Sequence, residues 1–228
     1  MCGIVSLKFC AKNLTKKDVY NKDILEVGSL DVNGSVRHDI EKKDPIKYVG
    51  IDMRNGRGVD VVCDACNILD TFGENSFDIL VSTMTLEHIE YWKKAIHNFK
   101  LIVKPGGIIL ITVPHVGSGY RPHPDDYWRY TLDDMKNIFS DFTINVLEKH
   151  NRLPGVYVKM TKPVDFIEND ISNYELYSAE KEKKYFYNRV KKKLRNNKKL
   201  LKLETTEKKR IKLKKKIRIL ERHLRNKK

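Results

Sequence analysis

The strongest constraint on the fold is a short apolar run that ends in an acidic residue and a glycine, Ile24-Leu25-Glu26-Val27-Gly28. A polar turn follows it, and a second apolar run ends in Asp52 roughly twenty residues further on. A glycine at the end of a parallel strand lets the backbone approach a ligand, and a carboxylate after the next strand accepts hydrogen bonds from ribose hydroxyl groups. The pattern therefore predicts a nucleotide-type cofactor at the edge of a parallel sheet.

The turn after Gly28 differs from the dinucleotide-binding fingerprint. Leu30 and Val32 stand where that fingerprint has further glycines, which a pyrophosphate needs in order to approach the backbone. We therefore expect a ligand without a pyrophosphate. Asn33 and Gly34 preserve the turn, because asparagine tolerates left-handed geometry and glycine adopts it freely.

Strand-like and helix-like segments alternate from residue 23 onward. The predicted strands are Ile24–Val27, Lys47–Ile51, Val59–Cys63, Asp78–Ser82, Ile108–Val113, 142–149 and 155–162, and the predicted helices lie at 34–41, at 91–103 and from Thr131. Such alternation is typical of an α/β fold with a doubly wound, mostly parallel sheet and helices on both faces. The sheet is expected to have seven strands.

Charge divides the chain into two parts. The net charge of the 228 residues is +15, but residues 180–228 hold 23 Lys and Arg against 5 Asp and Glu, a net charge of +18. The remaining residues hold 22 against 25, a net charge of −3. We expect an N-terminal segment at 1–21, one folded domain at 22–173 and a basic helical C-terminal extension at 174–228.

The basic extension carries an apolar stripe at helical spacing, which suggests a coiled coil. The stripe consists of Phe186, Val190, Leu194, Leu213, Ile217, Leu220 and Leu224. Asn196-Asn197 and Thr205-Thr206 interrupt it, so one continuous coiled coil is not expected. Three partners of this extension stay open: nucleic acid (RNA or DNA), an anionic membrane surface, and a second copy of the chain in a homo-oligomer.

The cysteines do not indicate a disulfide framework or a metal site. Cys63-Asp64-Ala65-Cys66 has zinc-like spacing, but no second pair accompanies it, so no metal is expected. The sequence shows no signal peptide and no run of membrane-spanning length. A cytoplasmic location is expected. The basic tail also allows a peripheral position at a membrane surface.

Together these motifs resemble class I S-adenosylmethionine-dependent methyltransferases over roughly residues 22–165. The resemblance implies a Rossmann-like methyltransferase sheet and S-adenosyl-L-methionine as cofactor. It assigns the turn after Glu26 to the methionine end, Asp52 to the ribose, and Asp64-Ala65 to the adenine. The cofactor-binding residues so implied are Glu26, Gly28, Ser29, Asn33, Asp52, Asp64, Ala65 and Met84.

The loop 114–131 follows the predicted strand 108–113 and is dense in chemically active side chains. Loops at the carboxyl ends of parallel strands commonly bind substrate. The candidate general bases there are His123, His115, Asp125 and Asp126, and the candidate acceptor-binding residues are Tyr127, Trp128 and Arg129. Alternatively, Tyr127, Trp128 and Arg129 lock the loop against the helix at 131–139. The segment His123–Thr131 also resembles methyltransferases associated with glycan and polysaccharide synthesis.

The leading hypothesis is an enzyme that methylates a hydroxyl group of a sugar, glycan or other small molecule. Two alternatives stay open: a nucleic-acid methyltransferase that uses the basic tail to bind RNA or DNA, and a non-catalytic methyltransferase-like binding module. Ser82-Thr83-Met84-Thr85 stands where enzymes acting on exocyclic base nitrogens carry Asn/Asp-Pro-Pro-aromatic, which disfavours the first alternative. Intact Glu26, Gly28 and Asp52 disfavour the second.

Overall fold

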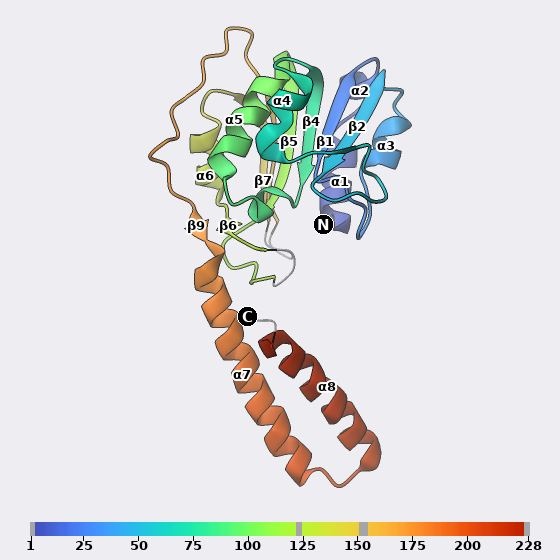
Figure 1. Cartoon of the computed structure of the whole chain (residues 1–228), viewed down its shortest axis with the longest axis vertical. Coiled ribbons are helices and arrows are strands. Elements are labelled where there is room, and N and C mark those ends of the chain that lie inside the picture. Colours follow the sequence, from blue (N-terminus) through green and yellow to red (C-terminus); the bar gives the residue numbers. More distant parts are fainter. Residues whose placement is uncertain (1–2, 122–124, 151–154, 226–228) are drawn as a thin grey trace. The chain divides into compact units, whose positions relative to one another are not determined.

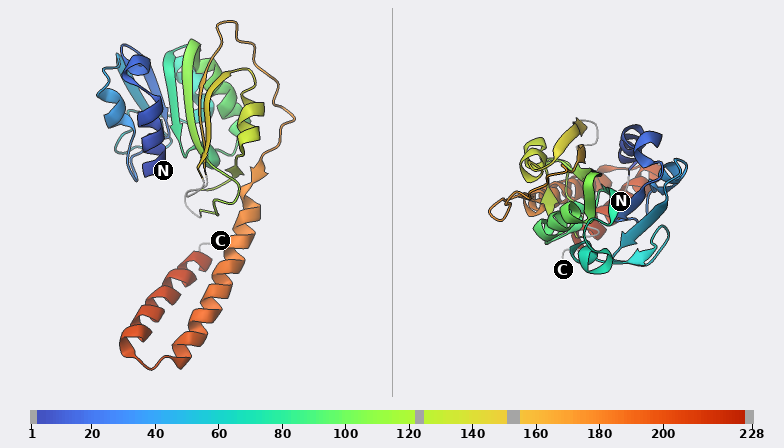
Figure 2. Two further views of the ribbon diagram at one scale, coloured as in Figure 1. Left: turned by 180° about the vertical axis from the view of Figure 1, so that it is seen from behind. Right: turned by 90° about the horizontal axis from the view of Figure 1, so that it is seen from above.

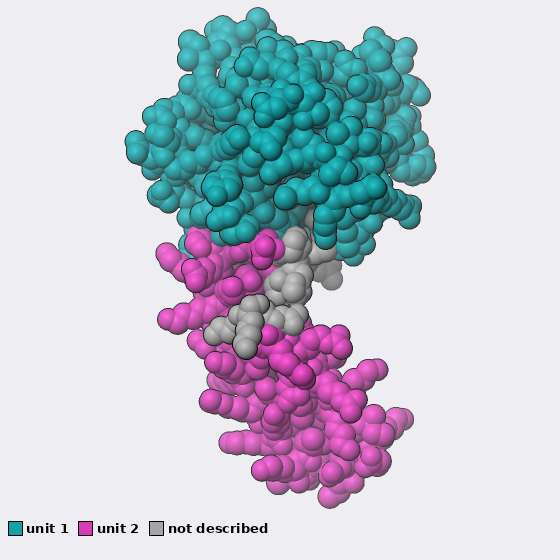
Figure 3. Space-filling view, in the orientation of Figure 1, with its two compact units in different colours: residues 1–118, 127–177 teal, residues 119–126, 178–228 magenta. Residues whose placement is uncertain are grey.

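The computed structural model describes residues 3–121, 125–150 and 155–225. It divides into two compact units, one formed by residues 1–118 and 127–177 and the other by residues 119–126 and 178–228 (Figure 3). The first unit contains the whole sheet, and the second consists of two helices and a loop segment.

The first unit is built on a seven-stranded sheet in the order β3-β2-β1-β4-β5-β8-β7 (Figure 1). Its strands are β1 Asp23–Val27, β2 Lys47–Asp52, β3 Val61–Val62, β4 Phe77–Thr83, β5 Val103–Pro114, β7 Thr143–His150 and β8 Gly155–Thr161. Strands β1 to β5 pair in parallel, and β8 runs antiparallel to both of its neighbours. The predicted doubly wound, mostly parallel sheet is confirmed. Two short strands, β6 Trp128–Arg129 and β9 Tyr177–Ser178, form a separate two-stranded sheet.

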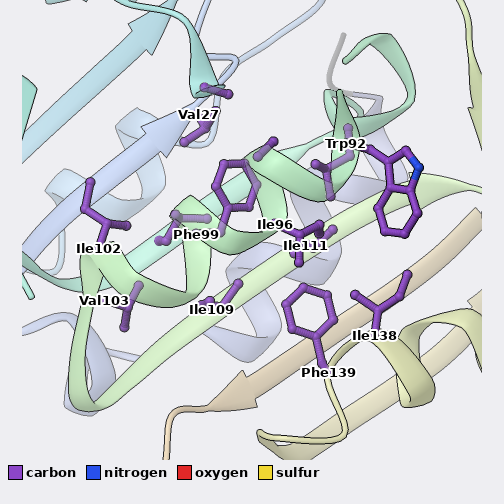
Figure 4. Close-up of a cluster of buried hydrophobic side chains, with 14 of the residues drawn as sticks. Val27, Trp92, Ile96, Phe99, Ile102, Val103, Ile109, Ile111, Ile138 and Phe139 are labelled. Atoms are coloured by element: carbon purple, nitrogen blue, oxygen red, sulfur yellow. The ribbon is translucent and has the colours of Figure 1, made fainter. Parts of the chain in front are cut away.

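Helices cover both faces of the sheet (Figure 2). They are α1 Ile4–Asn13, α2 Lys16–Val19, α3 Arg37–Glu41, α4 Ile68–Phe72, α5 Trp92–Ile102 and α6 Leu132–Ile138, with short 3₁₀ turns η1 Ala65–Asn67 and η2 Leu86–His88. Because strand side chains alternate, Leu25 and Val27 pack toward α4, α5 and α6, whereas Ile24 packs toward α1 and α3. Figure 4 shows the larger core, where Phe99 of α5 lies near Ile109 and Ile111 of β5.

Local signals explain where several elements begin and end. Thr131 and Asp134 form a capping box at the start of α6, at the residue where the sequence predicted that helix to begin. The helix expected at 34–41 is shorter, because the turn before it continues to Val36. The strand expected at Val59–Cys63 shrinks to two residues, because the chain is still in a turn at Val59, whose backbone N–H bonds to the Gly56 carbonyl oxygen.

The basic extension forms a helical hairpin within the second unit. Helix α7 spans Ala179–Leu203 and α8 spans Glu207–Arg225. The chain breaks at Thr205-Thr206, as expected, whereas the predicted interruption at Asn196-Asn197 is wrong because α7 continues through it. Val190 and Ile217, both from the predicted apolar stripe, are buried.

Side-chain contacts also tie the two helices to each other. Lys198 of α7 and Glu221 of α8 form an ion pair at 2.8 Å, and the rings of Phe186 and His223 lie 6.1 Å apart. The helices therefore pack on each other rather than forming one continuous coiled coil.

Candidate cofactor and acceptor site

Four neighbouring strands bring most of the predicted cofactor residues to one edge of the sheet. Val27 of β1 is paired with Ile51 of β2 and with Ser82 of β4, and Asp52 of β2 is paired with Val62 of β3. The residues at these strand ends or just after them are therefore close in space, namely Gly28, Asp52, Asp64 and Met84. The chain order reverses between β1 and β4, which is the position where open parallel sheets bind ligands.

Glu26 is a buried carboxyl group near the end of β1. Its side chain is 2 % exposed, and its Oε2 accepts a hydrogen bond of 2.6 Å from the Tyr48 hydroxyl group. Burial raises the pKa of Glu26 to about 7, although the Tyr48 bond and the Arg37 charge act in the opposite direction. A cationic ligand group beside Glu26 would stabilise its ionised form.

A polar network continues from Tyr48 away from Glu26. The Arg37 guanidinium lies 4.5 Å from the centre of the Tyr48 ring and forms an ion pair with Asp60. Asp60 also accepts a 2.6 Å hydrogen bond from the backbone N–H of Gly50. The contact of Tyr48 with Glu26 was not predicted. The alternation of side chains along neighbouring strands could have indicated this contact, because it places Tyr48 and Gly50 on the same face of the sheet as Glu26.

Gly28 lies where no larger residue fits. Its φ of +83° is in the left-handed region, and an added Cβ would lie 2.0 Å from Oγ1 of Thr85. The Thr85 hydroxyl group in turn lies 3.3 Å from the Val27 carbonyl oxygen and 3.2 Å from that of Thr83. Gly28 therefore lets the segment after β4 close directly onto the end of β1.

The turn without its usual glycines is supported by a second loop. Asp31 donates its backbone N–H to the Arg57 carbonyl oxygen at 2.8 Å, and Oδ1 of Asp31 accepts a bond from the N–H of Gly34. Gly58 has a φ of +88°, and a Cβ there would come within 2.6 Å of the Ser29 carbonyl oxygen. The close approach that extra glycines usually allow within the turn is thus supplied by Gly58 of the facing loop.

The remaining predicted cofactor residues occupy polar or strained positions at the same edge. Half-buried Asp52 accepts a 3.0 Å bond from the Arg54 N–H, and Asp64 caps η1 by accepting from the Cys66 N–H at 2.8 Å. Met84 is buried with a φ of +51°. Ala65 is buried, and Asn33 is exposed on the turn.

Unsatisfied hydroxyl groups make this edge suited to a polar ligand. Oγ of Ser29 and Oγ of Ser82 are buried and have no hydrogen-bond partner among the residues that the structure describes. Buried hydroxyl groups usually have a partner, so a polar ligand arriving here would complete their hydrogen bonding. The Ser29 hydroxyl group, the Glu26 carboxyl group and the Asp52 carboxylate fit a ligand with ammonium and ribose groups.

The loop 114–131, called the acceptor loop below, begins as a continuation of β5. It starts beyond the sheet edge that holds the predicted cofactor residues, the cofactor edge. His115 forms a parallel bridge with Tyr130, and its Nδ1 lies 2.6 Å from the Val116 carbonyl oxygen. Because a carbonyl oxygen only accepts, Nδ1 carries the proton and Nε2 is the basic nitrogen of the neutral ring. Met84 donates its N–H to the Thr112 carbonyl oxygen at 2.7 Å, so β5 and the end of β4 run together at this edge.

Residues 127–130 are fixed against the segment around η2. Nε1 of Trp128 donates to the carbonyl oxygens of Ile89 and Glu90 at 2.9 and 3.2 Å, and the N–H of Tyr127 donates to Glu87 at 2.8 Å. Arg129 is fully buried. These bonds support the locking alternative for the aromatic residues, with residues 87–90 as the partner of the locked segment in place of the expected helix at 131–139.

The middle of the loop belongs to the second unit. Tyr120 packs against Phe186 and Tyr187 of α7, with ring centres 6.1 and 6.3 Å apart. Asp126 is buried and accepts a 2.8 Å bond from the Arg121 N–H, whereas Asp125 is exposed. His123 lies outside the described residues. Of the four candidate bases, His115 is the one that belongs to the first unit together with the cofactor residues.

Comparison with known proteins gives a family for the chain. Residues 8–150 match a family model described as a methyltransferase domain. No curated protein matches the sequence.

Solved structures with the same fold include several methyltransferases. One is an S-adenosylmethionine-dependent methyltransferase from Mesorhizobium loti, 14 % identical, with a TM-score of 0.52 over 68 % of this chain and 100 % of the other. Another is the N-methyltransferase NodS from Bradyrhizobium japonicum in complex with S-adenosylhomocysteine, 14 % identical, with a TM-score of 0.53 over 67 % and 84 %. A third, from Burkholderia thailandensis, is 1,6-didemethyltoxoflavin-N1-methyltransferase, 13 % identical, with a TM-score of 0.51 over 70 % and 81 %.

Proposed function

The chain belongs to the methyltransferase domain family, and we propose that it transfers the methyl group of S-adenosylmethionine to a hydroxyl group of a sugar-like small molecule or glycan. When bound, the cofactor supplies a methyl group activated by its sulfonium. The protein must then bind the cofactor, align the acceptor and accept the hydroxyl proton.

The cofactor assignment rests on side chains that match the three polar parts of S-adenosylmethionine. Glu26, buried and adjacent to the Gly28 turn, suits the ammonium group of the methionine end. Asp52 suits the ribose hydroxyl groups, because a carboxylate retains acceptor capacity beyond its one bond to Arg54. Asp64 and Ala65, after the next strand, suit the adenine edge.

The observation that carries the hydroxyl assignment is the ring orientation of His115. Nδ1 faces the Val116 carbonyl oxygen, so Nε2 is the nitrogen that accepts a proton. An oxygen acceptor needs such a base, since a neutral hydroxyl group is a weak nucleophile. His115 follows β5 directly, and β5 pairs with β4 at the cofactor edge. His123, Asp125 and Asp126 stay alternative bases within the same loop.

The sugar-like character of the acceptor is proposed from the aromatic residues of the loop. Tyr127 and Trp128 are half-buried residues, and aromatic rings of such residues can stack on an apolar sugar face. The segment from His123 to Thr131 also resembles glycan-associated methyltransferases, which is an analogy of sequence and not of chemistry.

The proposal is tested by methyl transfer from radiolabelled S-adenosylmethionine into cell extract separated into glycan, lipid, nucleic acid and protein. We expect label in the glycan or small-molecule fraction, held as a methyl ether that resists mild alkali. His115→Ala should lower kcat by about a hundredfold or more with little change in cofactor affinity, because the base acts on the acceptor.

His97→Ala is the matched control, since His97 is an exposed histidine of α5 paired with Glu168. Label in nucleic acid or on nitrogen would contradict the hydroxyl proposal. A loss of activity in His123→Ala with full activity in His115→Ala would move the base to His123.

A further inference from the structure

The far end of the helical hairpin has an open groove with a partly apolar lining. Its apolar lining residues are Leu200, Leu203 and Leu213, and its charged lining residues are Glu204, Lys209, Lys212 and Lys216. We call this feature the tip groove, and its volume is about 360 Å³. It lies wholly within α7, α8 and the turn that joins them.

Two of the three apolar side chains of the tip groove are exposed. Leu200 and Leu203 are 52 % and 78 % exposed, whereas Val190 and Ile217 of the same two helices are buried. Leaving two adjacent leucines in water forgoes the free energy that their burial would supply. Exposed leucines one helical turn apart, beside an open groove, are the kind of surface that an apolar partner can cover.

The charge of the groove identifies an anionic partner. Lys209, Lys212 and Lys216 line it, against a single acidic lining residue, Glu204. The surrounding segment, residues 180–228, carries a net charge of +18. A partner must therefore combine negative charge with an apolar interior.

A lipid bilayer fits this combination better than a nucleic acid does. RNA and DNA are bound mainly through phosphate contacts and through aromatic or arginine side chains that stack on bases. Leucine side chains make neither of these two kinds of contact. The groove holds no aromatic residue among those that line it. Phe186 and Tyr187 lie at the other end of α7, where they pack on Tyr120.

We propose that the tip groove docks the protein on an anionic phospholipid bilayer. Leu200 and Leu203 enter the boundary between headgroups and acyl chains, and Lys209, Lys212 and Lys216 lie at the level of the lipid phosphates. Among the described helices, none is long and apolar enough to cross a membrane. In this proposal the hairpin lies on the surface of the bilayer, and the interaction is independent of the proposed methyl transfer.

The test is flotation of the full chain with vesicles of phosphatidylcholine alone or with about one-third phosphatidylglycerol, at physiological salt. We expect binding to the anionic vesicles only. Leu200→Ser with Leu203→Ser should weaken binding about tenfold, because two apolar side chains no longer enter the bilayer. Changing Lys209, Lys212 and Lys216 to Gln should weaken it about a hundredfold, roughly fivefold for each charge.

Matched variants separate the tip groove from the general charge of the tail. Lys191, Lys192 and Lys193 are exposed on α7, roughly 10 to 14 Å along the helix from Leu200, the nearest groove residue of that helix and beyond the screening length of about 8 Å. Their change to Gln should therefore have little effect. Tyr185→Ser with Ile219→Ser, at exposed positions away from the tip, is the apolar control.

Three outcomes would overturn the proposal. One is failure of the intact protein to bind anionic vesicles, and another is equal loss for the two lysine triplets. The third is tighter binding to single-stranded RNA in a gel shift that is unchanged by the leucine substitutions, which would assign the tail to nucleic acid. Far-ultraviolet circular dichroism of each variant checks that the hairpin stays helical.

Discussion

At the scale of single residues, the least expected feature is a carboxyl group whose charge state changes near neutral pH. Glu26 is buried with one hydroxyl partner, Tyr48, and its pKa is raised to about 7 by burial. The ordinary pKa of a glutamate is about 4.3 in an unfolded chain. The folded state therefore favours the protonated form, so this group contributes stability below the unfolded pKa that is lost as pH rises through the folded pKa.

This shift predicts two pH dependences that Glu26→Gln removes. The unfolding free energy of the native protein should fall by as much as about 3 kcal/mol between about pH 4.5 and 7. Affinity for S-adenosylmethionine should rise over about pH 5 to 7, because an ammonium group binds the ionised carboxylate more tightly. Denaturant melts and calorimetry across that range measure both.

Asp52→Ala serves as the comparison for the cofactor measurement. Loss of the ribose contact should cost about 1–3 kcal/mol of binding, roughly ten- to a hundredfold, to the same extent at each pH. If native protein and Glu26→Gln show the same pH slope, Glu26 does not contact the ammonium group.

At the scale of elements, the cofactor turn depends on a loop distant from it in the sequence. Gly58, with its φ of +88°, faces the Ser29 carbonyl oxygen, so a Cβ there meets backbone and not a flexible side chain. Gly58→Ala should therefore lower stability by about 2 kcal/mol or more and weaken cofactor binding. Thermal melts and calorimetry test this.

Gly56 in the same loop provides the control. A Cβ at Gly56 would meet only the end of the Leu30 side chain, which is able to rotate away. Gly56→Ala should therefore be much milder than Gly58→Ala. Equal effects of the two substitutions would show that the loop does not support the turn through the Gly58 contact.

The turn after Gly28 and the loop that contains Gly58 also show how much of the site could be predicted from the sequence. The strands, their parallel order and the place of Gly28 and Asp52 follow from patterns within each segment, since alternation and glycine placement are local. Contacts such as Gly58 with Ser29, or Tyr48 with Glu26, join segments about thirty and twenty residues apart, and their partners become visible only once the register is known. The same reason hid the locking of Trp128 onto residues 89 and 90.

At the scale of the whole molecule, the middle of the acceptor loop belongs to the same compact unit as the basic hairpin, whereas His115 and residues 127–131 belong to the sheet unit. Residues 119–126 cluster with residues 178–228, and Tyr120 packs between Phe186, Tyr187 and the Lys183 ammonium group, which lies 5.4 Å from its ring centre. None of the cofactor residues lies in this unit. Cofactor binding and acceptor handling should therefore respond differently to removal of the hairpin.

Truncation after residue 177 tests this division. The remaining domain retains the seven-stranded sheet and both cores, so it should fold and bind S-adenosylmethionine with nearly unchanged affinity. Turnover should fall, because Tyr120 loses its aromatic partners and the acceptor loop loses order.

Full-length Tyr120→Ala should reproduce that fall with the hairpin intact, whereas Tyr185→Ala, at an exposed ring of α7, should not. A truncated domain that fails to fold would mean that the hairpin stabilises the sheet domain itself, and full turnover in Tyr120→Ala would separate the loop from the hairpin.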